Sequence, residues 1–158
     1  MIKVILSDLS RTFLFVKDES WTETLNRLYS KLEKENPDYN FWDYFYIDRE
    51  YLELMRTLKS KYSINMFTAG YIQNHLELKN LFTPVFENIF NEESVGYTKN
   101  DAEAYKTIAQ RLNVNPQEIL FIDDDHKYCQ SAIGAGLQVF EMTGFQSLKS
   151  YLQTNNLL

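Results

Sequence analysis

The feature that most constrains the fold of this chain is the alternation of short apolar runs with stretches of helical periodicity. Short apolar runs bounded by polar residues are typical of strands that are buried on both faces of a parallel sheet. Parallel strands need crossover connections, which are usually helices. The pattern therefore predicts an α/β fold with a central five-strand, mainly parallel sheet. The expected strands are Ile2–Ser7, Ser63–Phe67, Val85–Phe90, Ile119–Ile122 and Leu137–Phe140.

Helical segments are expected between these runs. Two of them show a capping box, at Ser20–Glu23 and Asn100–Glu103, where the first side chain can cap the helix and Glu stands three residues on. Pro116 indicates a further short turn of helix, because its missing backbone N–H costs nothing at a first helical position. The other expected helices start after Asp48 and lie at Tyr71–Leu81, Tyr128–Ala135 and Ser147–Leu152.

Composition narrows the class of protein. The chain has 158 residues, the size of one domain, and 44% of them are hydrophobic, which is enough to bury a core. Lys and Arg number 16 against 22 Asp and Glu, with no basic stripe, so nucleic acid and anionic membranes are not expected partners. The single cysteine, Cys129, excludes an intramolecular disulfide and a Cys-rich zinc site. With no long apolar segment either, we expect a cytoplasmic protein.

Polar side chains follow three of the expected strands directly. Asp8 ends the first strand, Thr68 the second, and the run Asp123–Asp125 the fourth. In an open parallel sheet, ligands bind at the carboxyl ends of strands near the point where strand order reverses. Carboxylates that converge there repel one another unless a cation lies between them, and an all-oxygen ligand set suits Mg²⁺. The sequence therefore predicts a magnesium site.

Four segments, taken in order, resemble motifs I to IV of the haloacid dehalogenase-like (HAD) hydrolases. They are Asp8–Thr12 (DLSRT), Thr68–Gly70 (TAG), Gly96–Lys99 (GYTK) and Phe121–Asp124 (FIDD). The resemblance covers nearly the whole chain except roughly residues 15–47. It implies a Rossmann-like three-layer fold, a single HAD-like domain over 1–158, and a small phosphorylated substrate.

The resemblance also implies a role for each motif residue. Asp8 is then the nucleophile that forms an aspartyl-phosphate. Thr68 donates a hydrogen bond to a phosphoryl oxygen, and Lys99 neutralises charge on the nucleophile and the transferring group. The residues implied to hold Mg²⁺ are Asp8, Ser10 through its backbone carbonyl, Asp124, and Asp123 either directly or through water.

One position departs from the family pattern. The phosphatases of this family usually carry a second Asp two residues after the nucleophile, where it acts as general acid and base. Ser10 occupies that position here, and a hydroxyl has no pKa near neutrality. Acid–base help is typically worth about 10²–10⁴-fold in rate. We therefore expect a phosphatase that is slow on alkyl phosphates and better on substrates with good leaving groups.

The segment between motifs I and II is short for a cap domain. Since the helix and strand over 48–67 belong to the core, residues 15–47 remain for a minimal helical cap of one helix and an aromatic turn. A cap of this size is expected to leave the site open, which would admit a large substrate, or to leave it to be covered by another subunit. The aromatic residues of 39–46 are expected to pack within the cap.

Several alternatives remain open at this stage. Without an acid–base residue, the chain is alternatively a catalytically impaired module that binds a phosphate or a partner. A third interpretation is an interaction protein that uses the aromatic segment 39–46 as its interface. Thr68 and Lys99 are alternatively ordinary turn and surface residues, and one Asp of Asp123–Asp125 is alternatively a helix cap. A phosphorelay receiver is disfavoured, because there the acidic pair follows the first strand.

Overall fold

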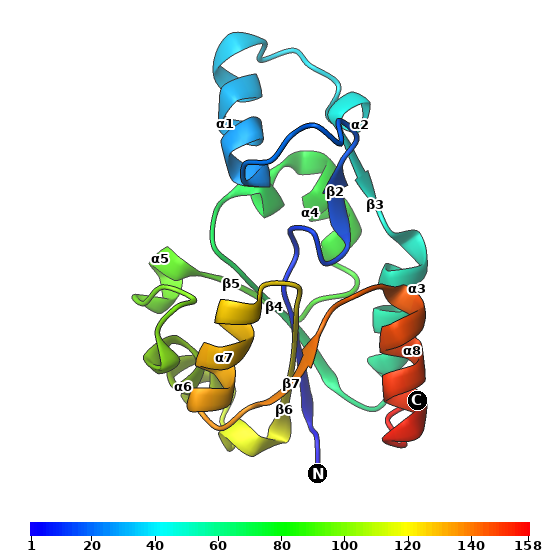
Figure 1. The fold of residues 1–158 in the computed structure, drawn as a ribbon, viewed down its shortest axis with the longest axis vertical. Helices are drawn as coiled ribbons and strands as arrows, with labels where there is room; N and C mark the ends of the chain where they lie inside the picture. The colour runs from blue at the N-terminus through cyan, green and yellow to red at the C-terminus, as the bar shows by residue number, and fades with distance from the viewer.

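The structure is a computed structural model that describes all 158 residues. Its central sheet has five parallel strands in the order β5-β4-β1-β6-β7 (Figure 1). The predicted five-strand α/β fold is therefore confirmed. The strands are β1 (Val4–Ser7), β4 (Ser63–Thr68), β5 (Asn88–Asn91), β6 (Ile119–Asp123) and β7 (Gln138–Glu141). Because β1 lies between β4 and β6, the carboxyl ends of these three strands lie side by side.

Helices cover both faces of the sheet, which gives three layers (Figure 1). One hydrophobic cluster joins Ile5 and Leu120 to buried side chains of α3, α4 and α8. A second cluster joins Leu6 and Phe121 to α6 and α7. Neighbouring residues of one strand thus enter opposite cores, as the two-residue period of a strand requires. The helices are α3 (Arg49–Leu58), α4 (Leu76–Phe82), α5 (Glu92–Val95), α6 (Ala102–Arg111), α7 (His126–Gly134) and α8 (Phe145–Thr154), with 3-10 turns η1 (Ile72–Asn74) and η2 (Pro116–Glu118).

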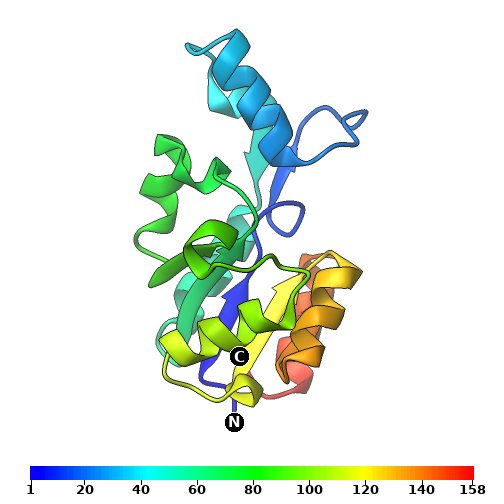
Figure 2. The same ribbon diagram turned by 90° about the vertical axis from the view of Figure 1, so that its left-hand side faces the viewer.

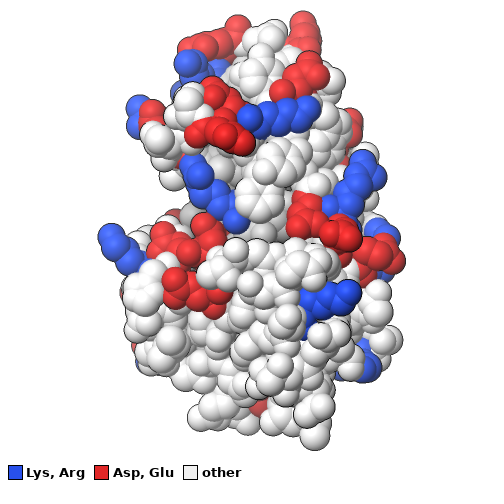
Figure 3. Space-filling model, turned by 45° about the vertical axis from the view of Figure 1, so that its right-hand side comes forward, with Lys and Arg blue, Asp and Glu red and all other residues white.

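A smaller part of the chain projects beyond the carboxyl ends of the strands (Figure 2). Strands β2 (Leu14–Val16) and β3 (Phe45–Ile47) form an antiparallel pair, and α1 (Leu25–Glu35) and α2 (Phe41–Tyr44) lie between them in the chain. Figure 3 shows a notch between this projecting part and the body, with charged side chains around it and few on the lower surface. No helix combines the length and the apolar character needed to cross a bilayer.

The connection from β1 to the projecting part is anchored in the core by Phe13. This ring is fully buried and stacks on Tyr51 of α3 at 4.6 Å between centroids, with 5° between the planes. It also contacts the rings of Phe82 and Phe86. The Tyr51 hydroxyl lies 2.7 Å from the hydroxyl of Ser7, which is the last residue of β1. The loop that follows β1 is therefore held from both sides by buried groups.

Two expected helix starts are wrong by a few residues. Helix α1 is capped by Thr24 and not by Ser20, whose hydroxyl instead donates to Asp18 at 2.6 Å. Helix α6 is capped by Asp101 and not by Asn100. In both cases the sequence holds a second capping residue nearby, so the motif alone does not select the start. The expected turn after Asn115 is confirmed, with its capping box.

Other differences concern the edges of the fold. The single helix expected over Tyr71–Leu81 is interrupted at His75, which caps α4 through its ring nitrogen. The third core strand lies at Asn88–Asn91, later than the expected Val85–Phe90, because Val85 and Phe86 belong to a buried turn after α4. The β2–β3 pair was not predicted, since aromatic residues at 39–46 indicated only a turn. Phe41 and Phe45 of that segment are buried, whereas Tyr46 is exposed.

We predict that Phe13→Ala destabilises the fold by about 3–5 kcal/mol, because it removes a fully buried ring from a close-packed cluster. The matched control is Phe15→Ala, two residues on, whose ring is half-buried and stacks only on Tyr46. Its cost should be markedly smaller. Urea unfolding followed by circular dichroism measures both, and equal losses would show that Phe13 is not a core anchor.

Candidate active site

The strand order brings two of the predicted residues to one place. Asp8 follows β1 directly, and its backbone N–H donates to Ile122 of β6 at 2.8 Å. Asp123 is the last residue of β6. Both side chains are almost completely buried, with 7% and 1% of their surface exposed. The parallel register of β1 and β6 is what places these two carboxylates together.

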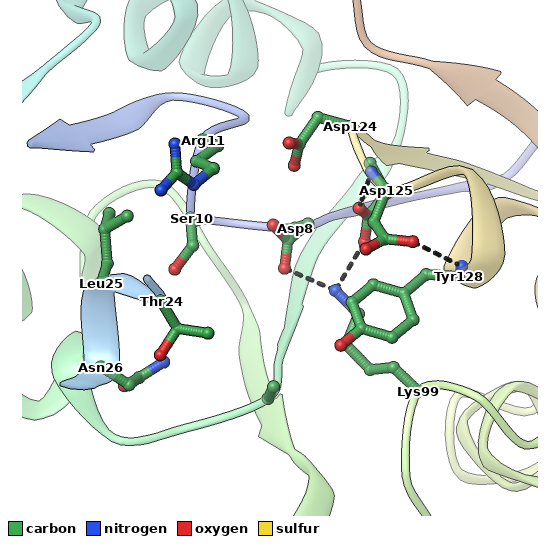
Figure 4. A pocket seen from close by; sticks show the side chains of 12 residues that line it. Asp8, Ser10, Arg11, Thr24, Leu25, Asn26, Lys99, Asp124, Asp125 and Tyr128 are labelled. Carbon is green, nitrogen blue, oxygen red and sulfur yellow. Dashed lines mark hydrogen bonds and ion pairs between the residues drawn. The ribbon is translucent and has the colours of Figure 1, made fainter. Parts of the chain in front are cut away.

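Lys99 lies between the two carboxylates. Its ammonium donates to Asp8 Oδ1 and to Asp123 Oδ2, each at 2.5 Å, and its side chain is 1% exposed (Figure 4). Burial alone would lower the pKa of this lysine, but the charges of Asp8 and Asp123 raise the pKa well above its ordinary value. Lys99 therefore carries a permanent positive charge inside the site.

The loop that carries Lys99 is fixed by its own contacts. The Lys99 N–H donates to Glu92 Oε1 at 2.7 Å, and its carbonyl accepts the hydroxyl of Tyr105 at 2.8 Å. The ammonium also lies 4.7 Å from the centroid of the Tyr128 ring, a cation–π distance. By contrast, Lys106, the other lysine near this helix start, pairs with Glu103 at the surface. Lys99 is the lysine that the fold delivers to the carboxylates.

Asp124 completes a group of three carboxylates. One oxygen each from Asp8, Asp123 and Asp124 lies within 4.8 Å of the others. Three carboxylates and one ammonium leave two negative charges in a mostly buried space. Burial, with the nearby charge of Asp8, raises the pKa of Asp123 to about 7 and that of Asp124 to about 6. Raised values of this kind indicate that Lys99 alone does not offset the burial and mutual repulsion of these carboxylates.

The carboxylate oxygens differ in the hydrogen bonds that they already accept within the protein. Asp123 is engaged through both oxygens, because Oδ2 accepts from Lys99 and Oδ1 accepts the Asp125 N–H at 2.8 Å. Asp8 Oδ2 and Asp124 Oδ1 share only the Thr12 hydroxyl, at 3.4 Å each. Asp8 and Asp124 therefore have the oxygens most available to a cation.

A cavity of about 170 Å³ opens beside these groups. The predicted residues Asp8, Ser10, Lys99, Asp123 and Asp124 all line it (Figure 4). Thr68 is buried at the end of β4 but does not line the cavity, where its neighbour Ala69 appears instead. The cavity is lined further by Arg11, Thr24, Leu25, Asn26, Asp125 and Tyr128. The first turn of α1 thus reaches the site.

Ser10 places an unpaired polar atom in this cavity. Its Oγ is buried and has no hydrogen-bond partner in the protein. A buried hydroxyl without a partner costs free energy, so this Oγ is a group that a ligand bound in the cavity would satisfy.

Other chemically active residues near the site have structural roles. The Asp125 side chain caps α7 by accepting from the backbone of Lys127 and Tyr128, which matches the helix-cap alternative for one residue of the acidic run. His126 is exposed and pairs with Glu141. The thiol of Cys129 is buried, and burial raises its pKa to about 12, so it is not a nucleophile.

Asn26 of α1 fastens the projecting part to the loop that follows β4. Its Oδ1 accepts from the backbone N–H groups of Tyr71 at 2.9 Å and Ile72 at 3.0 Å. A Cβ at Gly70 would lie 2.3 Å from the Asn26 side chain, so the contact requires glycine there. Neither this contact nor the cavity position of Arg11 was predicted. Arg11 stands inside the first motif, but Asn26 carries no local signal, because its role depends on how α1 docks.

Comparisons with known proteins agree with this arrangement. The family model of the haloacid dehalogenase-like hydrolases matches residues 7–136. A HAD family enzyme from Bacteroides thetaiotaomicron, solved in complex with magnesium and inorganic phosphate, has a TM-score of 0.69 at 16% identity and covers 94% of this chain and 98% of its own. A predicted HAD-like family hydrolase from Porphyromonas gingivalis has a TM-score of 0.68 at 13% identity, with 98% of each chain covered. Both share the fold described above.

One curated relative also matches. Enolase-phosphatase E1 of Parasynechococcus marenigrum is 30% identical over 88 residues, which is 54% of this chain. The match covers 36% of the relative, so the chain spans little more than a third of that protein's length.

The raised pKa values of Asp123 and Asp124 predict how the metal-free protein responds to pH. Their protons are held more tightly in the folded than in the unfolded chain, so stability is lost as the pH rises through about 6 and 7. Lys99 stays charged throughout this range. Without divalent ions, we expect the free energy of unfolding to fall by about 1 kcal/mol or more between pH 5.5 and 8.

Added Mg²⁺ should reverse this loss, and should raise the melting temperature more at pH 8 than at pH 5.5, because protons compete with a cation for the same oxygens. Thermal unfolding at the two pH values, with EDTA or with Mg²⁺, measures both effects. A metal-free protein that is more stable at pH 8 would contradict the assignment of these groups.

We predict that Gly70→Ala weakens the attachment of α1, because the new methyl group meets the Asn26 side chain. Overpacking of this kind typically costs about 1–3 kcal/mol. Removing the obstructing side chain in Gly70→Ala/Asn26→Ala should cost less than the sum of the two single changes. Chemical unfolding of the four proteins gives the coupling, and purely additive costs would show that the contact does not form.

Proposed function

The chain belongs to the haloacid dehalogenase-like hydrolases, and from this premise we propose that it is a Mg²⁺-dependent phosphatase acting on a small phosphate ester through an aspartyl-phosphate on Asp8. The observation that carries the proposal is the Lys99 ammonium held between Asp8 and Asp123 beside the carboxylate of Asp124. A structural ion pair needs one carboxylate for one lysine. The additional negative charge is accounted for by a bound cation.

The residues present fit a magnesium ion. The donor set is all oxygen, the carboxylates lie close together, and burial with mutual repulsion raises the pKa values of Asp123 and Asp124. We assign Asp8, Asp124 and the backbone carbonyl of Ser10 as ligands. Because both oxygens of Asp123 are engaged, we assign it to holding Lys99 and to contact through water. When bound, Mg²⁺ offsets the repulsion between the nucleophile and the phosphate.

Asp8 performs the first step. One of its carboxylate oxygens bonds to phosphorus, and the bond from phosphorus to the ester oxygen breaks, which releases the alcohol. Lys99 orients Asp8 through one carboxylate oxygen, and Thr12 contacts the other oxygen. A water oxygen then bonds to phosphorus, and the bond between Asp8 and phosphorus breaks to give inorganic phosphate. We assign Thr68, buried at the end of β4, a supporting hydrogen bond to a phosphoryl oxygen.

Ser10 limits the rate of both steps. No acid–base residue takes the place of the usual second Asp, since Asp125 caps α7 and Tyr128 has a pKa raised by burial. A departing alkoxide therefore takes its proton from water, and the attacking water loses one without help. Substrates whose leaving group needs no proton should be hydrolysed best.

We assign residues 15–47 the role of a minimal cap. The first turn of α1 lines the cavity, and Asn26 ties this helix to the loop after β4. The cavity, at about 170 Å³, is smaller than the roughly 300–1,000 Å³ usual for drug-sized ligands. A substrate of a few carbon atoms fits it. The Bacteroides enzyme of the same fold was solved with magnesium and phosphate, the two species this proposal requires.

The test is release of p-nitrophenol from p-nitrophenyl phosphate in the presence of Mg²⁺. We expect slow turnover by the wild type, none by Asp8→Asn, and an increase of about 10²-fold or more in Ser10→Asp. Ethyl phosphate, with its poor leaving group, should be hydrolysed far more slowly by the wild type and should gain most from Ser10→Asp. Circular dichroism spectra confirm that the variants are folded.

The competing function is a module that binds a phosphate or a partner without turnover. Equal inactivity of the wild type, Asp8→Asn and Ser10→Asp in folded form would establish that alternative and refute the phosphatase. Activity that persists in EDTA would refute the metal dependence.

A further inference from the structure

Arg11 is a cationic residue of the cavity that the proposed mechanism does not use. It lines the same cavity as Asp8 and Ser10 (Figure 4). Of the two cations there, Lys99 already donates to two carboxylates, whereas Arg11 forms no ion pair. A free guanidinium beside a phosphate site is a strong anion-binding group, because its planar fork matches carboxylate and phosphate oxygens.

The backbone at Arg11 is also unusual. Its φ is 62°, in the left-handed region that favours glycine and that costs energy for a residue with a Cβ. The turn itself needs no arginine, since glycine would adopt it without strain. Strained positions of this kind cluster at functional sites, where the side chain has a use.

The Arg11 side chain is held in place, but only some of its N–H groups have hydrogen-bond partners. Its Nη2 donates to the carbonyls of Glu23 at 2.9 Å and Trp21 at 3.4 Å, just before α1. The N–H groups on Nε and Nη1 make no hydrogen bond within the protein. These contacts are to neutral carbonyls, so they fix the guanidinium without neutralising it. Arg11 is thus held near Trp21 and Glu23, just before α1, and its Nε and Nη1 groups can still donate hydrogen bonds.

We propose that Arg11 determines specificity by binding a second anionic group of the substrate, so that the preferred substrate is a small phosphate ester carrying a carboxylate or a second phosphate. This proposal rests on the phosphatase function only for the position of the reacting phosphate. That phosphate lies at Asp8, and the second anion lies toward α1. Thr24 and Asn26, at the start of α1, also line the cavity and add neutral polar groups to it.

The test uses binding of non-hydrolysable analogues to the Mg²⁺-loaded protein, measured by calorimetry. The probes are 3-phosphonopropanoate, which carries a carboxylate, 1,3-propanediphosphonate, which carries a second phosphonate, and propylphosphonate, which carries neither. We expect the wild type to bind at least one of the two probes with a second anionic group about tenfold or more tightly than propylphosphonate. The first two probes distinguish a carboxylate from a second phosphate as the recognised group.

The variants separate recognition from a structural role. Arg11→Gln should remove the preference while leaving affinity for propylphosphonate within about threefold, and Arg11→Lys should keep part of it, since it retains the charge but not the fork. Arg11→Gly, which relieves the backbone strain, should behave like Arg11→Gln. The matched control is Arg27→Gln, on the outer face of α1, where Arg27 pairs with Glu23. It should leave the preference unchanged.

Two outcomes overturn the proposal. One is a wild type that binds the three probes equally or binds none of them. The other is an Arg11→Gln or Arg11→Gly protein that weakens all probes by the same factor, which a purely structural role predicts. Because binding is measured without turnover, the result is independent of the p-nitrophenyl phosphate assay, and the two proposals can fail separately.

Discussion

The buried contact of Lys99 with Asp8 and Asp123 is the interaction on which the rest of the site depends. A lysine and two carboxylates are costly to bury, and the cost is offset only if all three are brought into close contact. The sheet order β4-β1-β6 supplies the two carboxylates, and the loop before α6 supplies the lysine. Neighbouring residues hold these three groups in position. Tyr105, for instance, donates to the Lys99 carbonyl, and its ring lies against Phe67 and Phe121.

The charge around Lys99 also lowers the stability of the metal-free protein. Lys99 neutralises only part of the charge of Asp8, Asp123 and Asp124, so the metal-free site keeps an unbalanced negative charge in a buried place. A protein selected for stability alone would replace one carboxylate with a neutral residue. The site instead has all three carboxylates and an unpaired Ser10 hydroxyl. Both features are unfavourable in the ligand-free protein and would be satisfied by a bound cation and ligand.

The sheet and the meeting of Asp8 with Asp123 could be predicted from the sequence, because both follow from local patterns, whereas Lys99 was indicated only by the family resemblance. A strand such as Ile119–Ile122 is an apolar run, and Asp8 and Asp123 stand where such runs end. The docking of α1 could not be predicted. Asn26 reaches Tyr71 and Ile72 only because Gly70 has no side chain, and this fit exists only in three dimensions. The β2–β3 pair was missed for a similar reason, since Phe45 is buried by tertiary packing and not by its own periodicity.

The loop after β1 shows how one backbone turn connects fold, chemistry and specificity. The left-handed conformation of Arg11 folds the chain back, so that the N–H groups of Phe13 and Leu14 both donate to the Leu9 carbonyl. This reversal turns the Thr12 hydroxyl toward Asp8 and buries Phe13 beneath the loop. It also sends the Arg11 side chain out toward α1. A single strained residue therefore sets the direction of the loop, the contact between Thr12 and Asp8, and the position of the Arg11 guanidinium near the start of α1.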